Sequence, residues 1–235
     1  MLDLHTHILP AMDDGSRNVD ETMEMLAAEK AMGVTRIALT PHFYPHREDP
    51  ERFLRRRARC YAQMENDARY EGVRPKRLLL GAEVAYFEGI SRMEDVEKLC
   101  IGDTRALLVE MPFCRWNDRM LGEILYLQKH CDLQPVLAHV ERFLKYQPGG
   151  LMEELADSGV CLQVNASFFL HWQTRSKAMK MLSRGQIHFL GSDCHNMQAR
   201  KPNMGDALQT ISKKLGKDAL QHLTRMERML LEGTR

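Results

Sequence analysis

Short apolar runs alternate with longer amphipathic stretches along the 235-residue chain. The runs are rich in Leu, Ile, Val and Ala, and their length suits strands better than helices. Strands are predicted at residues 1–5, 35–40, 77–83, 106–110, 134–139, 160–164 and 187–191. Because the runs are apolar almost throughout, they are typical of strands buried on both faces, as in a parallel sheet.

The stretches between the runs predict helices. Asn18 is a suitable N-cap because Glu21 follows three residues later, and Gly33 stands where a glycine commonly ends a helix. Further helices are predicted at residues 50–70, 118–130, 150–158, 174–184, 204–215 and 218–231. This rhythm predicts an α/β fold in which helices cover a parallel sheet. No repeat, low-complexity tract or linker divides the chain, so residues 1–235 are predicted to form a single domain.

Composition narrows the classes of partner and compartment. Lys and Arg number 33 against 32 Asp and Glu, and a formal charge of +1 gives no reason to expect binding to nucleic acid or a membrane surface. The six cysteines form no CxxC pattern, and neither a signal peptide nor a long apolar stretch is present. These features predict a cytoplasmic protein with reduced thiols and no transmembrane segment.

Residue types that bind metals gather where the predicted strands end. His5 and His7 are two residues apart, so both imidazoles can point to the same side of a strand. Asp14 lies in a turn that can return its carboxylate toward the strand ends. The other members of the set are His42, Glu83, Glu110, His139, Asp193 and His195. Parallel α/β folds build their sites at the carboxyl ends of their strands.

This set exceeds what one ion needs, since a catalytic zinc takes about three protein ligands. It therefore predicts two or three divalent metal ions. Imidazole and carboxylate without a well-placed thiolate suit manganese, iron, zinc or magnesium.

The chain resembles the polymerase and histidinol phosphatase (PHP) superfamily, and within it the bacterial protein-tyrosine phosphatases encoded with capsule and exopolysaccharide genes. The resemblance covers almost the whole chain. It is carried by Asp3-Leu4-His5-Thr6-His7-Ile8-Leu9-Pro10, Asp13-Asp14-Gly15, Thr40-Pro41-His42, Gly81-Ala82-Glu83, Leu108-Val109-Glu110, Ala138-His139-Val140-Glu141-Arg142, Gln163-Val164-Asn165 and Ser192-Asp193-Cys194-His195-Asn196.

The resemblance implies a distorted seven-stranded β/α (TIM-like) barrel with a trinuclear metal centre at its C-terminal mouth, with manganese the preferred ion. By this resemblance His5, His7, Glu83 and Asp193 would hold one ion, while Glu83 would bridge to a second ion held with Glu110 and His139. Asp14, His42 and His195 would hold the third.

The same resemblance implies a chemistry and a partner. A metal-bound hydroxide would attack phosphotyrosine, and Arg142 and Arg200 would hold the phosphate. The implied partner is a phosphotyrosine protein, such as the C-terminal tail of a tyrosine kinase of capsule or exopolysaccharide synthesis. Ala11-Met12 and Phe168-Phe169 depart from the family pattern without touching a ligand, so they bear on substrate preference.

Three alternatives stay open. Cys194 and Arg200 have the spacing of a cysteine-dependent phosphatase, but the residues between them include no glycine to shape a phosphate loop. The chain could instead be a histidinol phosphatase or another PHP phosphoesterase. The third alternative is a metal-binding module without catalysis.

Two further features are assigned no firm role. His46 could donate a proton or touch substrate, although an exposed loop histidine is the favoured interpretation. The basic stretch Arg52, Arg55, Arg56, Arg57 and Arg59 is interpreted as a solvated helix face rather than a docking surface for an acidic or phosphorylated tail. The oligomeric state is left open.

Overall fold

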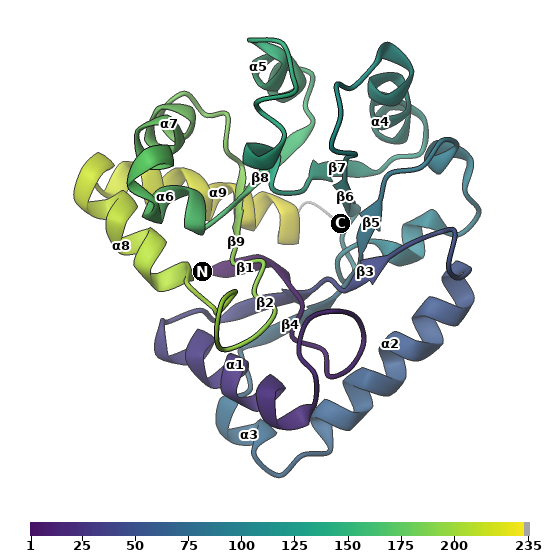
Figure 1. Ribbon diagram of the computed structural model, residues 1–235, viewed down its shortest axis with the longest axis vertical. Coiled ribbons are helices and arrows are strands. Elements are labelled where there is room, and N and C mark those ends of the chain that lie inside the picture. Colours follow the sequence, from purple (N-terminus) through teal and green to yellow (C-terminus); the bar gives the residue numbers. More distant parts are fainter. Residues whose placement is uncertain (233–235) are drawn as a thin grey trace.

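The strands pair in parallel and form two curved sheets that the helices surround (Figure 1). The computed structural model describes residues 1–232. Within them the strands are β1 (Leu2–Thr6), β2 (Arg36–Leu39), β3 (His42–Phe43), β4 (Arg77–Leu80), β5 (Glu83–Ala85), β6 (Ala106–Glu110), β7 (Gln134–Leu137), β8 (Cys161–Asn165) and β9 (Phe189–Gly191). Three strands follow the order β1-β2-β4, and six follow the order β3-β5-β6-β7-β8-β9. The predicted parallel α/β fold is confirmed.

The predicted strand 77–83 was wrong in one respect, because two strands, β4 and β5, occupy this region. The strand paired beside it is interrupted too: β2 ends at Leu39 and β3 begins at His42. Pro41 lies between them and has no N–H to donate. Hydrogen bonds still link the segments across the break: Gly81 N donates to Leu39 O at 2.9 Å, and Glu83 N donates to Pro41 O at 3.0 Å.

The other end of the six-stranded sheet returns toward β1. A single bridge joins Thr6 to Cys194. It is supported by hydrogen bonds from Asp193 N to His5 O at 2.8 Å and from His7 N to Cys194 O at 3.0 Å. The first and last strands therefore bring their carboxyl ends side by side.

The helices follow the predicted pattern, with short additions. They are α1 (Val19–Ala31), α2 (Pro50–Glu65), α3 (Tyr70–Val73), α4 (Asp118–His130), α5 (Leu151–Asp157), α6 (Ser167–Leu170), α7 (Trp172–Ser183), α8 (Met204–Leu215) and α9 (Lys217–Glu232), with 3-10 turns at Ile90–Arg92, Val96–Leu99 and Val140–Arg142. The predicted cap is confirmed, since Asn18 accepts a hydrogen bond from Glu21 N. None of these helices, within the described part of the chain, combines the length and apolar character needed to cross a bilayer.

The prediction of one helix over residues 50–70 was wrong at its end. Helix α2 stops at Glu65, and α3 starts only at Tyr70. Between them the Asp67 carboxylate accepts a hydrogen bond from Arg69 N at 2.9 Å. A short polar side chain that bonds to nearby backbone competes with the helix in this way.

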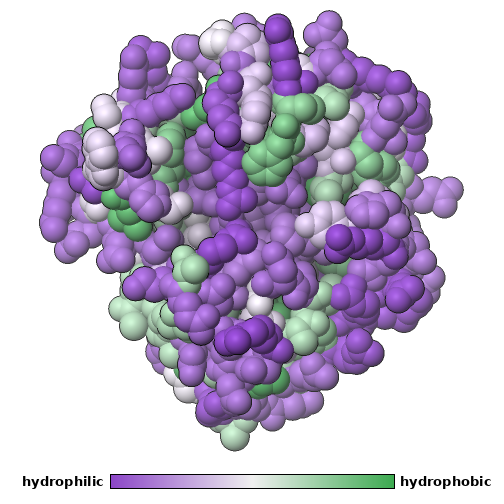
Figure 2. Space-filling view, in the orientation of Figure 1, coloured by the Kyte–Doolittle hydropathy of each residue, from purple (hydrophilic) through white to green (hydrophobic). Residues whose placement is uncertain are grey.

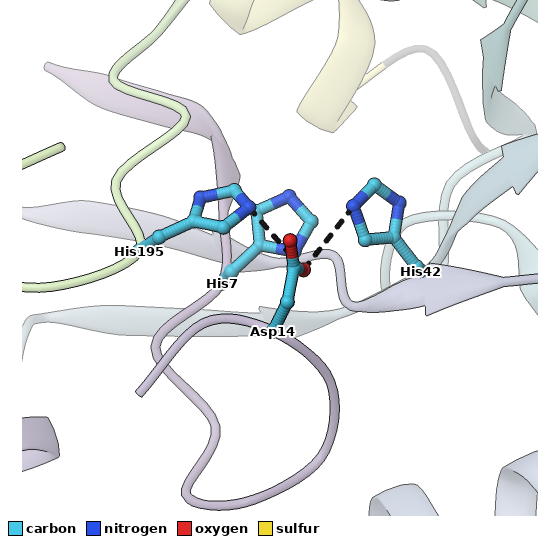
Figure 3. Close-up of side chains that lie close together, drawn as sticks. All are labelled: His7, Asp14, His42 and His195. Carbon is cyan, nitrogen blue, oxygen red and sulfur yellow. Dashed lines mark ion pairs between the residues drawn. The ribbon is translucent and has the colours of Figure 1, made fainter. Parts of the chain in front are cut away.

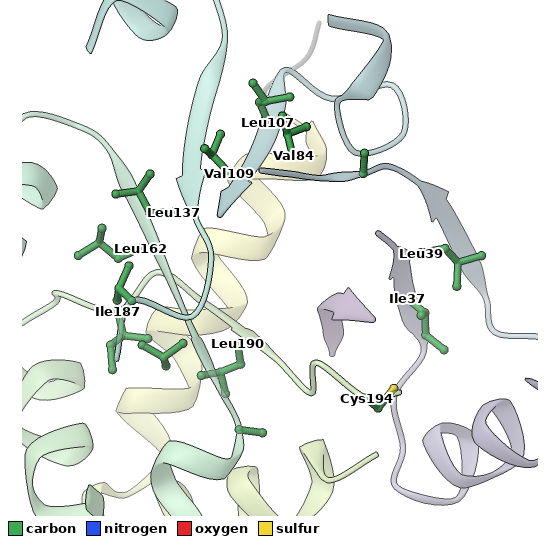
Figure 4. Close-up of a cluster of buried hydrophobic side chains, with 14 of the residues drawn as sticks. Ile37, Leu39, Val84, Leu107, Val109, Leu137, Leu162, Ile187, Leu190 and Cys194 are labelled. Carbon is green, nitrogen blue, oxygen red and sulfur yellow. The ribbon is translucent and has the colours of Figure 1, made fainter. Parts of the chain in front are cut away.

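Alternate residues of the strands serve two separate apolar clusters. Leu107 and Val109 of β6 pack with the helices in the larger cluster, part of which Figure 4 shows. Ala106 and Leu108 belong to a smaller cluster inside the curve of the sheet. Because side chains alternate along a strand, Glu110 falls on this inner side. The inner face thus changes from apolar to polar toward the carboxyl ends of the strands, which is where the candidate site lies.

Candidate metal centre

Four side chains from separate strand ends converge on one small volume. The Nε2 atoms of His5 and His7 lie 3.1 Å apart. Oε2 of Glu83 lies 3.2 Å from His5 Nε2 and 3.3 Å from His7 Nε2. Oδ1 of Asp193 lies 3.7 Å and 3.5 Å from the same two nitrogens. These are the side chains that the resemblance assigns to one ion.

The second oxygen of Glu83 faces another group. Oε1 of Glu83 lies 2.8 Å from His139 Nε2. That nitrogen is also 3.5 Å from Oε1 of Glu110. With one oxygen directed to each group, Glu83 has the geometry of a bridging carboxylate.

A third group forms on the side of the turn after β1. Oδ1 of Asp14 lies 3.5 Å from Nε2 of His42 and 3.5 Å from Nε2 of His195 (Figure 3). His7 also has a nitrogen close enough to join this group. The turn therefore does return its carboxylate toward the strand ends, as the sequence predicts.

Some of the clustered ligand atoms lack hydrogen-bond partners within residues 1–232, as expected for atoms that bind a cation. Glu83 Oε2 and His195 Nε2 are buried and, among the described residues, have no partner in hydrogen-bonding geometry. Unpaired buried polar atoms are costly, so such a cluster is stabilised when a cation satisfies them. Borderline and hard divalent ions are the ones that accept mixed nitrogen and oxygen donors.

The electrostatics of the cluster are mixed: burial alone would lower the pKa of His5 and His7, but the carboxylates around them raise it, so that without a cation these imidazoles take up protons. Burial would raise the pKa of Glu83, but His5 and hydrogen bonds from neighbouring imidazoles hold it well below its usual value. Burial and the charge of Glu83 raise the pKa of Glu110 to about 6. Burial and His7 lower the pKa of His195 to about 4. Neutral imidazoles and ionised carboxylates are the forms that bind metals.

Two supporting residues were assigned no role from the sequence. Asp13 Oδ2 accepts hydrogen bonds from His7 Nδ1 at 2.7 Å and from His42 N at 2.9 Å. Gln163 Oε1 lies 3.2 Å from His5 Nδ1 and accepts from His139 N at 2.8 Å. Such partners orient an imidazole and select its tautomer. The signal that could have found Asp13 is its place beside Asp14, in the turn that follows the two histidines.

The backbone around the site is unusual. His139 and Asp193 have positive φ, at 31° and 53°, although neither is glycine. Strain of this kind concentrates at functional sites. Gly15 is required for a different reason: a Cβ there would lie 2.2 Å from His7 O. Ala11 also has a positive φ of 52°.

Arg142 and Arg200 meet at the outer oxygen of Asp193. An Nη2 atom of each guanidinium lies 2.7 Å from Asp193 Oδ2. Asn165 Nδ2 donates to the same oxygen at 2.8 Å. Each arginine has five N–H donors, so most remain available for an anion beside the metal groups.

The sulfur of Cys194 is unsuited to nucleophilic attack. Its side chain is fully buried, and burial raises the pKa of the thiol well above its usual value, with Glu29 and Asp3 adding to the effect. The thiolate, not the thiol, is the reactive form. Burial of this thiol therefore argues against the cysteine-dependent alternative. His46 is exposed and belongs to none of the metal-binding groups among the described residues.

The fold and the side-chain set define a class: α/β proteins with a candidate multinuclear metal centre at the carboxyl ends of parallel strands. Residues 1–231 match the family described as capsular polysaccharide synthesis, CpsB/CapC, and the chain belongs to this family.

Curated relatives match over nearly the full length. Tyrosine-protein phosphatase YwqE of Bacillus subtilis (strain 168) is 28% identical over 240 residues, covering 99% of this chain and 92% of the relative. Tyrosine-protein phosphatase CpsB of Streptococcus pneumoniae is 30% identical over 230 residues, covering 92% and 91%.

Solved structures agree with this assignment. The chain superposes with a TM-score of 0.84 and 26% identity on a structure from crystals of YwqE from Bacillus subtilis and CpsB from Streptococcus pneumoniae, described as metal-dependent tyrosine phosphatases. The match covers 99% of this chain and 94% of the other. An inactive dihydroorotase-like domain from Chaetomium thermophilum shares the fold alone, with a TM-score of 0.55 and 9% identity.

Proposed function

We propose that this protein is a metal-dependent protein-tyrosine phosphatase. The observation that carries the proposal is the convergence of imidazoles and carboxylates from separate strand ends on Glu83, beside two arginines that meet at Asp193. A site built only to bind a metal has no need of guanidinium groups with spare donors next to the ions. The names of the relatives, tyrosine-protein phosphatases, support the same reaction.

The proposed cofactors are two or three divalent ions, with manganese preferred over iron, zinc or magnesium. His5, His7, Glu83 and Asp193 would hold one ion, and Glu83 would bridge it to a second held with Glu110 and His139. Asp14, His42 and His195 would hold the third. When bound, the ions would supply an acidified water as nucleophile and positive charge for the phosphate oxygens.

The chain's own residues would orient the phosphate and balance its charge. Arg142 and Arg200 are about 36% and 38% exposed, so an incoming phosphate can reach them. Their planar donors match pairs of phosphate oxygens, and stabilising charge on these oxygens is the main contribution a protein makes to phosphoryl transfer. The leaving group of phosphotyrosine has a pKa of about 10 in its acid form, so a dedicated general acid is not required.

The proposed architecture completes the family barrel. If β2 with β3 and β4 with β5 each count as one interrupted strand, the sheet has the seven strands of the predicted barrel, and residues 1–235 form its single domain. The Thr6–Cys194 bridge supports closure between the first and last strands.

We also propose that the protein acts in the cytoplasm on a phosphotyrosine protein, with the tail of a tyrosine kinase of capsule or exopolysaccharide synthesis as the candidate substrate. The capsular description of the family supports this.

The test compares substrates and variants on metal-loaded protein. Phosphotyrosine peptide should be hydrolysed, and chelation should abolish the activity until metal is restored. Arg142→Lys and Arg200→Lys should each lower kcat/KM by about tenfold to a hundredfold with metal content retained, because lysine lacks the paired donors. Arg119→Lys is the matched control, since Arg119 is exposed and pairs only with Glu88 among the described residues.

Two results would decide against the proposal. Faster hydrolysis of histidinol phosphate than of phosphotyrosine peptide would favour the other PHP phosphoesterases. Metal-replete protein that hydrolyses no phosphate monoester would favour a binding module without catalysis.

A further inference from the structure

A cavity of about 520 Å³ opens directly beside the candidate metal centre. Its lining residues are Met12, Asp13, Asp14, His42, Tyr44, Arg47, Glu48, Arg52 and Arg56. Asp14 and His42 also belong to the metal-binding groups, so the cavity and the centre are continuous. The face of the molecule that Figure 2 shows is mostly hydrophilic, with smaller hydrophobic areas between the polar side chains.

The basic stretch of α2 is divided by this cavity. Arg52 and Arg56 line it, whereas Arg55 and Arg59 are exposed elsewhere on the helix. Arg57 points inward and donates to Gly81 O at 2.6 Å. The prediction of one solvated basic face was therefore wrong for part of the stretch. A helix turns about 100° per residue, so Arg57 faces away from Arg56, whereas Arg59, seven residues after Arg52, lies on the same side of the helix about 10 Å farther along its axis.

The arginines of the cavity are not equally available. The Arg56 guanidinium is already bonded within the protein, because it pairs with Glu48 and donates to Met12 O at 2.5 Å. Nε of Arg52 lies 3.9 Å from Glu48 Oε2, and 65% of the Arg52 side chain is exposed. Within residues 1–232, Arg47 has no carboxylate within ion-pair distance. Arg47 thus presents positive charge without a carboxylate partner among the described residues, and Arg52 keeps an exposed side chain that Glu48 pairs with only loosely, in a cavity that Asp13, Asp14 and Glu48 also line.

Aromatic stacking fixes one of these charges next to the centre. The Arg47 guanidinium lies over the Tyr44 ring, 4.5 Å from its centroid. The other neighbour of that ring is His42, with ring centroids 5.2 Å apart and planes at 27°. A guanidinium held on a ring face by cation–π attraction loses less freedom when it binds an anion.

We propose that this cavity binds a second anionic side chain of the substrate, a carboxylate or a second phosphate, on a residue next to the phosphotyrosine. The inference rests on the proposed function and adds a subsite to it. The scissile phosphate is assigned to Arg142 and Arg200, and neither lines the cavity. Residues of an extended peptide are about 3.4 Å apart along the chain, so we place the second anionic side chain at a flanking position near enough to enter the cavity that begins at Asp14 and His42.

The experiment uses matched peptides on the full-length, metal-loaded protein. One phosphotyrosine peptide carries glutamate, glutamine or a second phosphotyrosine at the flanking positions, and p-nitrophenyl phosphate is the reference substrate without flanks. The ratio of kcat/KM between acidic and neutral peptides is measured for wild type, Arg47→Gln, Arg52→Gln and Arg47→Glu. The matched control is Arg59→Gln, which removes an equal charge from α2 outside the cavity.

The wild type should prefer an anionic flank, and each glutamine variant should lower the preference by about fivefold, the effect of losing one exposed ion pair. Arg47→Glu should favour the neutral peptide, and Arg59→Gln should keep the wild-type ratio. A gain from glutamate identifies a carboxylate as the ligand, and a gain from the second phosphotyrosine alone identifies a phosphate.

Failure of the subsite is distinct from failure of the enzyme. Equal rates on all peptides, or an equal loss in Arg59→Gln, would overturn the subsite while hydrolysis persists. Absence of hydrolysis with every aryl phosphate, the reference included, would instead overturn the proposed function.

Discussion

Replacing Asp13 by asparagine tests whether residues behind the ligands set metal affinity. Asp13 is isosteric with asparagine, but its carboxylate accepts three hydrogen bonds: from His7 Nδ1 at 2.7 Å, His42 N at 2.9 Å and Gly15 N at 2.9 Å. An amide has one oxygen. If that oxygen keeps the bonds from His7 and His42, the amide N–H₂ faces the N–H of Gly15, so one bond is lost.

The magnitude follows from these contacts. The bond to His7 changes from a charged to a neutral acceptor, and the N–H of Gly15 loses its partner, which together cost about 1–3 kcal/mol. Part of this loss appears in metal binding, because Asp13 orients the imidazole of His7 and holds the backbone before the His42 ring. We expect metal affinity to fall by about tenfold to a hundredfold, as for other residues behind metal ligands.

The assay titrates chelated Asp13→Asn protein with Mn²⁺ and measures both bound metal and hydrolysis of phosphotyrosine peptide. Activity should return at higher metal concentration, with kcat restored to within a few-fold of wild type. Asp103→Asn is the control, because Asp103 is exposed and lies outside the metal-binding groups of the described residues. Wild-type metal affinity in Asp13→Asn, or inactivity at full metal content, would refute the reasoning.

Further predictions concern stability and the thiol. Leu162 is fully buried, so Leu162→Ala should lower the free energy of unfolding by about 2–5 kcal/mol in urea titrations. Ala11→Gly should raise it by about 0.5–1 kcal/mol because Ala11 has φ 52°, and an unchanged urea midpoint would count against that strain. Cys194→Ala should keep activity and chelator sensitivity, and loss of activity with full metal content would revive the thiol mechanism. Burial and His222 lower the pKa of His188 to about 4, so the unfolded state binds more protons between about pH 6.5 and 4. Stability should therefore fall by up to about 3 kcal/mol as pH falls through this range, and less so in His188→Gln; equal acid sensitivity in both proteins would contradict this assignment.

Much of the fold could be predicted because local signals agree with the tertiary structure. The apolar run at residues 106–110 is a strand with the predicted bounds, and Asn18 caps the predicted helix. The break between β4 and β5 could not be predicted. It depends on the close approach of the Gly81 backbone to Ile101 and on hydrogen bonds to the neighbouring strand. Propensity along the chain carries no information about such partners.

The metal-binding residue types were visible in the sequence, whereas their supports were not. His5 and His7 are two residues apart, so a strand directs both imidazoles to the same side. Their carboxylate partners stand at the ends of other strands. The roles of Asp13 and Gln163 depend on hydrogen bonds that form only when distant segments meet; His5 and Gln163, for example, are 158 positions apart in the sequence. Of the three arginines that line the cavity, Arg52 and Arg56 were visible only as part of a basic stretch, because which members of that stretch reach the cavity depends on where the helix lies against the rest of the fold.

The most direct test of the central claim is anomalous diffraction from crystals of catalytically active, metal-loaded protein. The proposal predicts two or three anomalous peaks enclosed by His5, His7, Glu83, His139 and Asp193 and by the Asp14 group, with Glu83 between two of them. A map with no peak among these side chains, in crystals of protein that hydrolyses phosphotyrosine, would contradict it.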